Sequence, residues 1–232
     1  MPHDRSIQNL LGSWWIEDKT KTLKPGRLIK AFVPHVDQIP LELNLLGRSE
    51  PTNHTKARYE ISPLRINQPP KKDTLPVAGV PLQDNEKLTA YKSKKRPMLV
   101  LAEGFEVPEE YRRGDHPKWQ TSPTIIAAPY YGVKQNEKRK GFIPEFVDRV
   151  RAGEYPHYLW DELPMDKGEE SLLRLDHLQP IGKHHQSIEI CDFRLCEDAL
   201  IILDEYLNWF LKGNLDSKTL LADLRKVLMQ SE

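Results

Sequence analysis

The sequence predicts an α+β fold that is mainly β, in which short antiparallel strands close into a small barrel and helices lie near both ends. Short apolar runs are separated by Gly and Pro, and the clearest helical patterns come only after these runs. Strands that alternated with helices would instead predict a parallel sheet. Hydrophobic residues make up 38% of the 232 residues, which is enough for a folded core. We expect a single domain over residues 1–232.

Residues 1–23 are expected to form a helical extension. Apolar residues recur there at helical spacing, and Asp4 is the expected N-cap. The acidic residues Glu17 and Asp18 close the segment, so the helix is expected to pack on the core and not on an anionic membrane. The residues of the apolar face are Ile7, Leu10, Leu11, Trp14 and Trp15.

The barrel core is expected over residues 24–211, interrupted by an insertion at about residues 34–90 and a long loop at about residues 103–122. The insertion is rich in proline and polar residues, and Pro63 would keep its one alternating segment, residues 56–66, at a sheet edge. The expected core strands are residues 27–33 (RLIKAFV), 97–101 (PMLVL), 124–129 (TIIAAP), 157–163 (HYLWDEL) and 172–178 (LLRLDHL).

Three further segments show helical patterns. Residues 141–151 allow a short helix, and residues 192–211 give the clearest one, with Gly213 just past its end. The C-terminal segment, residues 214–232, is expected to form a last helix over residues 217–229.

Composition and motifs exclude several classes of function. Lys plus Arg and Asp plus Glu number 34 each, so a nucleic-acid surface must come from local clustering. No phosphate-binding or dinucleotide-binding glycine motif and no His or Cys set at ligand spacing is present, so we expect no cofactor and no metal. Cys191 and Cys196 are expected to be reduced, half-buried thiols.

The chain shows no secretory signal pattern and no apolar stretch that approaches the length of a membrane span. We therefore expect a cytoplasmic protein that does not associate with a membrane.

Two basic clusters flank the second and third expected strands. Lys94 and Lys95 precede the strand at residues 97–101, and a second cluster follows the strand that ends at Pro129. If these strands pair, both clusters border one groove, in which cations contact phosphates and aromatic faces stack on unpaired bases. Two solvated loop edges are the alternative. The remaining residues of the expected RNA-binding surface are Tyr130, Lys134, Lys138 and Arg139.

The order of the motifs resembles that of the PemK/MazF family of toxin endoribonucleases. In that family a glycine-led first strand is followed by an Arg-Pro strand, a third strand, a Ser-hydrophobic strand with an acidic-Gln pair, and a closing helix. The resemblance implies an SH3-like barrel, also found in CcdB, that forms a homodimer and cleaves single-stranded RNA without a metal. The corresponding segments are PGRLIKAF from residue 25, KRPMLVL from residue 95, IIAAPYY from residue 125, SLLRLDHLQPI from residue 171 and DFRLCEDALIILDEYLNWFL from residue 192.

The resemblance also implies catalytic roles for three residues. Arg96 is the arginine of the Arg-Pro motif, and its guanidinium would bind the charge that develops on the phosphate. Tyr131 stands where the family has a catalytic threonine and would donate a hydrogen bond. His177, after Asp176, stands at the family's glutamine and is expected to titrate near neutral pH, with His157 as the alternative.

Three functions remain open at this point. The first is a toxin-like endoribonuclease of a type II toxin–antitoxin system, with an antitoxin protein as partner. The second is a catalytically inactive barrel that binds RNA or protein in a defence or regulatory complex. The third is a gyrase poison like CcdB, which the Arg-Pro strand disfavours because that motif belongs to the nuclease branch.

Overall fold

The computed structural model describes residues 5–50, 52–53, 56–68, 82, 86–105, 107–111, 123–134, 141–165 and 168–230. The chain forms two compact units. The main unit comprises Met1–Ala31 and Lys95–Glu232, and the inserted unit comprises Phe32–Lys94. The bounds of the inserted unit are therefore close to those of the insertion expected at about residues 34–90.

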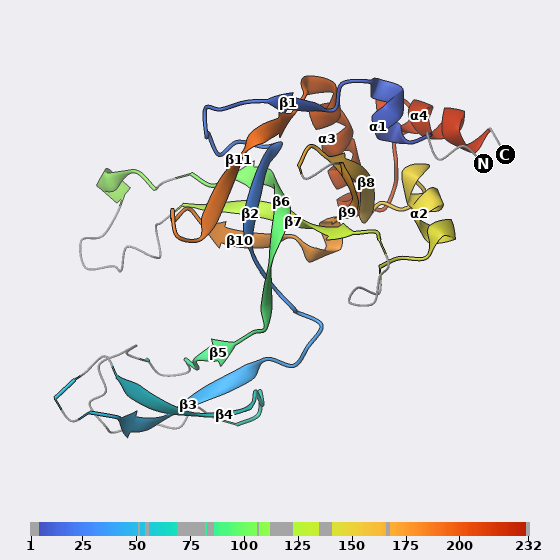
Figure 1. Ribbon diagram of the computed structural model, residues 1–232. Coiled ribbons are helices and arrows are strands. Elements are labelled where there is room, and N and C mark those ends of the chain that lie inside the picture. Colours follow the sequence, from blue (N-terminus) through green and yellow to red (C-terminus); the bar gives the residue numbers. More distant parts are fainter. Residues whose placement is uncertain are drawn as a thin grey trace. The chain divides into compact units, whose positions relative to one another are not determined.

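The main unit is built on a sheet of eight strands (Figure 1). The pairs β1–β11, β11–β2, β6–β7, β7–β9, β8–β9 and β10–β7 are antiparallel. The order is β1-β11-β2-β6-β7-β9-β8, with β10 also paired with β7. The strands are β1 (Trp15–Glu17), β2 (Arg27–Pro34), β6 (Ser93–Glu103), β7 (Thr124–Gly132), β8 (Tyr158–Leu163), β9 (Glu169–Arg174), β10 (Gln179–Gly182) and β11 (Ile188–Leu195).

The α+β class with mainly antiparallel strands is confirmed, but the described strands do not close into a barrel. The sheet runs from β1 at one edge to β8 at the other, and side chains link these two edges. The Nε1 atom of Trp15 in β1 donates to Oδ1 of Asp161 in β8 at 2.9 Å. Gln8 bonds the backbone of Glu162, with Oε1 accepting from N at 2.7 Å and Nε2 donating to O at 3.3 Å. The sheet is therefore bent enough for a side chain of β1 to reach β8, and Gln8 of α1 reaches the same edge strand, while no backbone ladder joins β1 to β8 among the described residues.

Four of the expected strands are confirmed as β2, β6, β7 and β8, and the fifth is only partly right. Residues 172–174 lie in β9, whereas Leu175–His177 form a 3-10 turn before β10. The strands β1 and β11 are absent from the expectation, which treated their residues as helical or left them unassigned. Both strands form their backbone hydrogen bonds with segments distant in the sequence, since Trp15 pairs with Leu195 and Ile188 with Ala31.

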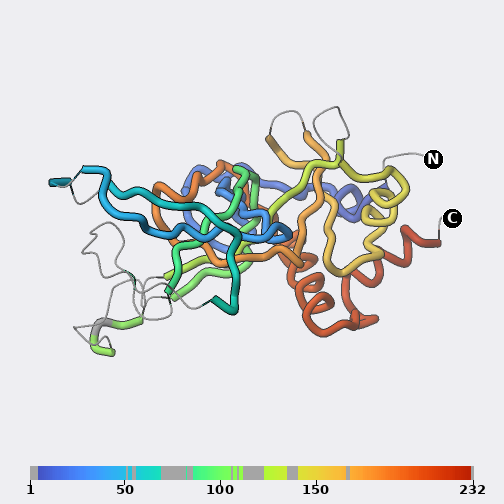
Figure 2. The backbone as a smooth tube through the Cα atoms, turned by 90° about the horizontal axis from the view of Figure 1, so that it is seen from below, coloured from blue at the N-terminus to red at the C-terminus, as the bar shows by residue number. Residues whose placement is uncertain are grey.

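The described residues form four α-helices beside the sheet, and Figures 1 and 2 both show α1, α2 and α4 toward one end of the main unit. The first is shorter than expected. Its N-cap is Ser6, whose Oγ accepts from the Asn9 N–H at 3.1 Å, and Trp15 already belongs to β1. The expected cap Asp4 lies outside the described residues. The helices are α1 (Ile7–Leu11), α2 (Pro144–Arg151), α3 (Glu197–Lys212) and α4 (Leu220–Met229).

The expected helix over residues 192–211 starts five residues late. Cys196 is the N-cap of α3, with its Sγ accepting from the Ala199 N–H at 3.4 Å, and residues 192–195 are the end of β11. The C-terminal boundary is as expected, because Gly213 takes the left-handed conformation at φ 75° that favours glycine. Both Cys191 and Cys196 are free and half-buried, as expected.

The sheet of the main unit carries hydrophobic clusters on both faces. On one face, Leu99, Tyr130 and Leu173 pack with residues of α1, α3 and α4. On the other face, Trp160 and Leu172 pack with Val147 and Val150 of α2. Leu172 and Leu173 are neighbours in β9, so the alternation of a strand accounts for the division between the two clusters.

The inserted unit contains a three-stranded antiparallel sheet in the order β4-β3-β5. Its central strand β3 was not anticipated, while the alternating segment at residues 56–66 corresponds to β4. Pro63 ends β4 at a sheet edge, as expected for a residue that cannot donate to a ladder. The strands are β3 (Leu41–Arg48), β4 (Ala57–Pro63) and β5 (Thr89–Ala90).

Candidate functional site

The candidate site forms around Tyr131, near the end of β7. In the β6–β7 ladder Met98 lies opposite Pro129, so the residues just beyond this pair, Arg96 and Tyr131, emerge close to each other. The Arg96 guanidinium carbon lies 4.1 Å from the centre of the Tyr131 ring, a cation–π contact. Pairing between β6 and β7 thus positions the first two residues of the expected site.

The third expected residue reaches the same ring from a different element. His177 lies in the 3-10 turn that follows β9, and its Nδ1 is 2.8 Å from the Tyr131 hydroxyl. The two rings meet edge-on with centroids 5.5 Å apart. The contact fits either neutral tautomer: an unprotonated Nδ1 accepts the phenolic hydrogen, whereas a protonated Nδ1 donates to the phenolic oxygen and leaves Nε2 unprotonated. The structure therefore brings together Arg96, Tyr131 and His177, which are distant in the sequence.

A second arginine, which was not among the expected site residues, completes this group. The Arg174 guanidinium carbon is 5.4 Å from the centre of the Tyr131 ring and 5.5 Å from that of Tyr158. The Arg174 Nε donates to Oδ1 of Asp176 at 3.0 Å. The sequence did carry a signal for Arg174: it follows Leu172 by two residues in β9, so the two side chains lie on the same face of the strand. We call Arg96, Tyr131, Arg174, Asp176 and His177 the Tyr131 cluster.

The Tyr131 cluster contains more basic than acidic side chains. Partial burial acts to raise the pKa of Asp176, but hydrogen bonds and the charge of Arg174 outweigh burial and lower this pKa. Asp176 is therefore ionised near neutral pH and offsets the charge of Arg174. The His177 Nε2 is 3.9 Å from Asp176 Oδ2. Arg96 adds a further positive charge beside the Tyr131 ring.

Tyr130, the neighbour of Tyr131, is not an RNA-stacking residue, and this expectation is corrected. Its side chain is 2% exposed and points to the opposite face of the sheet. The hydroxyl donates to Oδ2 of Asp161 at 2.7 Å, and the indoles of Trp14 and Trp15 donate to the same carboxylate at 3.3 and 2.9 Å. We call these four residues the Asp161 cluster. A buried ring cannot stack on a base.

Burial dominates the electrostatics of the Asp161 cluster. Desolvation raises the pKa of Asp161 to about 7, although the three hydrogen bonds from Tyr130, Trp15 and Trp14 favour the ionised form. Desolvation, with the nearby carboxylate, also raises the pKa of Tyr130 well above its ordinary value. The Asp161 cluster was missed in the sequence, where Asp161 stands as one polar residue in an alternating strand.

The expected basic surface is only partly described. Lys95 forms an ion pair with Glu189, and Lys134 is exposed after the end of β7. Lys94 is exposed and is the last residue of the inserted unit. The expected residues Lys138 and Arg139 lie outside the described residues. The alternative histidine, His157, packs its ring against Tyr158 and Phe210, at centroid distances of 5.3 and 6.3 Å.

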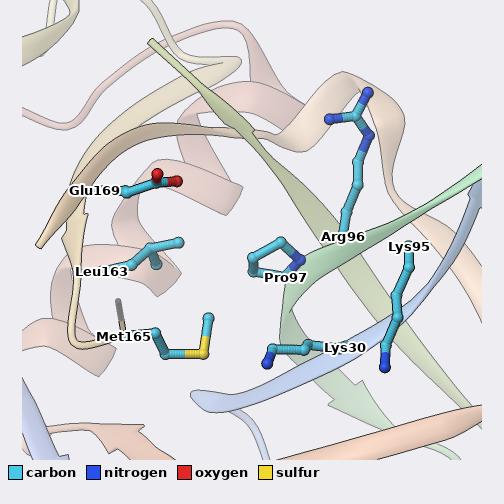
Figure 3. A pocket seen from close by; sticks show the side chains of 7 residues that line it. All are labelled: Lys30, Lys95, Arg96, Pro97, Leu163, Met165 and Glu169. Atoms are coloured by element: carbon cyan, nitrogen blue, oxygen red, sulfur yellow. The ribbon is translucent and has the colours of Figure 1, made fainter. Parts of the chain in front are cut away.

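A cavity of about 290 Å³ adjoins Arg96 (Figure 3). It lies among β2, β6 and the segment that joins β8 to β9. Figure 3 shows Glu169, Leu163 and Met165 along one side of the cavity, with Pro97 and Lys95 opposite them and Lys30 below. The lining residues are Lys30, Lys95, Arg96, Pro97, Leu163, Met165 and Glu169.

Two general features of the described chain bear on the site. Over those residues, no group of three or more His, Cys, Asp or Glu side chains has an arrangement that could hold a metal ion. None of the helices in the described part is both long and apolar enough to cross a membrane.

Comparison of the chain with protein-family models, with curated proteins and with solved structures gives no match. A functional assignment therefore depends on the residues of the site itself.

Proposed function

We propose that this protein is a metal-independent endoribonuclease that cleaves single-stranded RNA, in the manner of PemK/MazF toxins. The observation that carries the proposal is the convergence on Tyr131 of Arg96 from β6 and His177 from the turn after β9. These residues supply a permanent cation, a phenolic hydroxyl and an imidazole that can exchange a proton. The proposed cleavage of RNA uses a cation, a hydrogen-bond donor and a base.

In the proposed reaction the ribose 2′-oxygen attacks the adjacent phosphorus. The bond from 2′-oxygen to phosphorus forms, the bond from phosphorus to the 5′-oxygen breaks, and a 2′,3′-cyclic phosphate and a 5′-hydroxyl result. The proton of the 2′-hydroxyl passes to the general base, and the departing 5′-oxygen takes up a proton. No redox step and no co-reactant is needed.

Each residue of the Tyr131 cluster has a defined task in this scheme. Arg96 binds the nonbridging phosphate oxygens, where negative charge increases in the transition state. His177 accepts the 2′-hydroxyl proton through Nε2 in the tautomer whose Nδ1 carries the ring hydrogen and donates it to the Tyr131 oxygen. Tyr131 holds the imidazole in that tautomer, and the Arg174–Asp176 pair holds the turn that carries His177.

The proposal includes the wider features that the sequence resemblance implies. The bent antiparallel sheet would be an open variant of the SH3-like barrel, the active form would be a cytoplasmic homodimer, and an antitoxin protein would be its partner. Light scattering of the purified chain at tens of micromolar tests the dimer, and a monomer there would contradict it. Purification from cells that express the neighbouring genes tests the antitoxin.

Incubation with a mixed-sequence single-stranded RNA in EDTA tests the activity. We expect fragments with 2′,3′-cyclic phosphate and 5′-hydroxyl ends. The Arg96→Ala variant, purified in parallel, controls for a contaminating ribonuclease and should leave the RNA intact. RNA that stays intact with the wild-type chain, but is retained in a binding assay, would favour the catalytically inactive barrel.

A further inference from the structure

The cavity beside Arg96 combines an apolar floor with charged sides. Pro97, Leu163 and Met165 provide the apolar surface, and Leu163 is 3% exposed. The volume of about 290 Å³ is close to the ~300 Å³ at which sites for small ligands begin. A flat ring fits such a floor, because its faces are apolar while its edges carry the polar atoms. Methionine adds a polarisable sulfur that makes favourable contacts with aromatic rings.

Two lysines from neighbouring strands stand at one side of this cavity. Lys30 of β2 and Lys95 of β6 both pair with Glu189, Lys30 at 3.4 Å. The hydrogen bond from Lys95 lowers the pKa of Glu189, so this carboxylate stays ionised. Glu189 therefore holds two ammonium groups close together that would otherwise repel each other. An anion with several oxygens can bind both ammonium groups at once.

The charges at the cavity are divided between its two sides. The cations are Lys30 and Lys95 and the carboxylates are Glu169 and Glu189, whereas the Arg96 guanidinium points away from the cavity (Figure 3). Because Glu169 lies across the cavity from Lys95, one side is basic and the other acidic (Figure 3). A ligand with a negative group at one end and hydrogen-bond donors at the other matches this polarity.

Arg96 stands between the cavity and the Tyr131 cluster. It borders the cavity with its neighbours Lys95 and Pro97, but its guanidinium points away from the cavity (Figure 3) and lies over the Tyr131 ring. A nucleotide bound in the cavity would therefore lie across β6 from the phosphate that Arg96 is proposed to bind.

We infer that the cavity is a nucleotide subsite, which binds a phosphate at Lys30 and Lys95 and a base against Pro97 and Met165, with its N–H edge toward Glu169. Guanine is the preferred base, because it alone presents two adjacent N–H donors, at N1 and N2, to a carboxylate. Uracil presents a single N–H between two carbonyl oxygens, which a carboxylate repels. The inference rests on the proposed function for its place in the RNA chain.

Calorimetric titration of the full chain with 5′-GMP, 5′-UMP and inorganic phosphate tests the subsite without any cleavage. We expect 5′-GMP to bind at least tenfold more tightly than either of the other two probes. Binding of inorganic phosphate as tight as that of 5′-GMP would reduce the cavity to a nonspecific anion site and overturn the inference.

Variants of the lining residues test whether 5′-GMP binds in this cavity. Replacement of both Lys30 and Lys95 by Ala should weaken 5′-GMP binding by about tenfold or more, because hydrogen bonds to charged groups are lost. Glu169→Gln should reduce the preference for 5′-GMP over 5′-UMP. Lys218→Ala removes an exposed lysine from the segment before α4 and should leave both affinities unchanged. Unchanged affinity in the double variant would refute the subsite, provided that its melting temperature equals that of the wild type.

The subsite and the proposed function fail in different ways. Tight 5′-GMP binding that depends on Lys30 and Lys95, in a chain that never cleaves RNA, would support the subsite and reject the nuclease. Cleavage of RNA with cut positions that are independent of guanine, and unchanged by Glu169→Gln, would support the nuclease and reject the subsite.

Discussion

Tyr130 and Tyr131 are neighbours on β7, and the sheet places them in opposite surroundings. The phenol of Tyr130 is buried and donates to a buried carboxylate among two indoles. The phenol of Tyr131 is only half-buried and bonds an imidazole among two guanidinium groups. The same residue type thus joins a structural cluster on one face and the candidate site on the other.

The two clusters differ in whether their surroundings favour a charged group. In the Asp161 cluster burial makes ionisation costly, so the group contributes to the link between β1, β7 and β8 best when protonated. In the Tyr131 cluster the permanent charge of Arg96 lies over a half-buried ring, next to a second guanidinium and an imidazole. Changes in the first cluster should therefore alter stability, and changes in the second should alter activity.

The largest effect is expected from ionisation of Asp161. Its folded pKa of about 7 lies above the ordinary 3.8. The contribution to the unfolding free energy is therefore full below about pH 4 and is lost as pH rises through 7, by about 4 kcal/mol in total. Urea unfolding of the wild type and of Asp161→Asn from pH 5 to pH 8 measures this. Asp161→Asn should lack the part of the slope, at most about 1.4 kcal/mol per pH unit, that Asp161 contributes.

An identical pH slope in the wild type and in Asp161→Asn would contradict this assignment. Asp223→Asn removes an exposed carboxylate from α4 and is the matched control, which should retain the wild-type slope.

The next effect concerns Arg96. Arg96→Ala should reduce the rate of RNA cleavage by about 100- to 1000-fold, since one charge-stabilising donor is lost. The melting temperature should change little, because a partly exposed arginine contributes under about 1 kcal/mol to folding. Arg96→Lys should also lose most of the rate, because an ammonium cannot bind two phosphate oxygens in a planar fork.

Arg149→Ala is the control for Arg96, because it removes another arginine that stacks on a tyrosine, Tyr155, at 5.0 Å. A large fall in melting temperature of Arg96→Ala, with cleavage retained, would make Arg96 a structural residue.

The two tyrosines test the comparison directly. Tyr130→Phe should lower the unfolding free energy by about 1–3 kcal/mol, since a buried carboxylate loses a donor, and cleavage should persist. Tyr131→Phe should leave the melting temperature nearly unchanged and slow cleavage by about tenfold, since His177 loses the bond that orients it. Thermal melting and cleavage rates of both variants give the result, and a reversed pattern would break the comparison.

The smallest effect is expected at Lys134, which is exposed beyond the end of β7. If Lys134 contacts one phosphate, Lys134→Ala should lower the slope of log affinity against log salt by about 0.7 for an uncleavable RNA. Stability should be unchanged. Fluorescence titrations at several salt concentrations measure the slope, and an unaltered slope would place Lys134 outside the RNA path.

The sequence was most informative where local pattern and tertiary pairing agree. Residues 27–33, 97–101 and 124–129 are short apolar runs and become β2, β6 and β7, and Gly213 marks the end of α3. It was misleading at residues 7–15 and 192–195, where helical spacing continued into residues that pair as strands. There β1 and β11 are held by ladders to distant partners, which no local pattern contains.

For the candidate site, sequence order pointed to Arg96, Tyr131 and His177, and the fold brings these side chains together. It could not separate Tyr130 from Tyr131, because the assignment of each ring to a face depends on which side of β7 meets α1, α3 and α4. Arg174 and the cavity residues Lys30, Leu163 and Met165 were missed for the same reason, since their proximity to Arg96 or Tyr131 exists only after folding.

The sequence by itself determined the class of the fold, the main strands and the residue types of the candidate site, since these follow from periodicity, turn residues and motif order. The tertiary structure alone decided that the sheet stays open, with Trp15 and Asp161 linking its edges by side chains. It also decided which tyrosine is buried and which faces Arg96. Both outcomes depend on contacts between residues far apart in the chain, where a side chain's free energy is set by neighbours that its own segment does not supply.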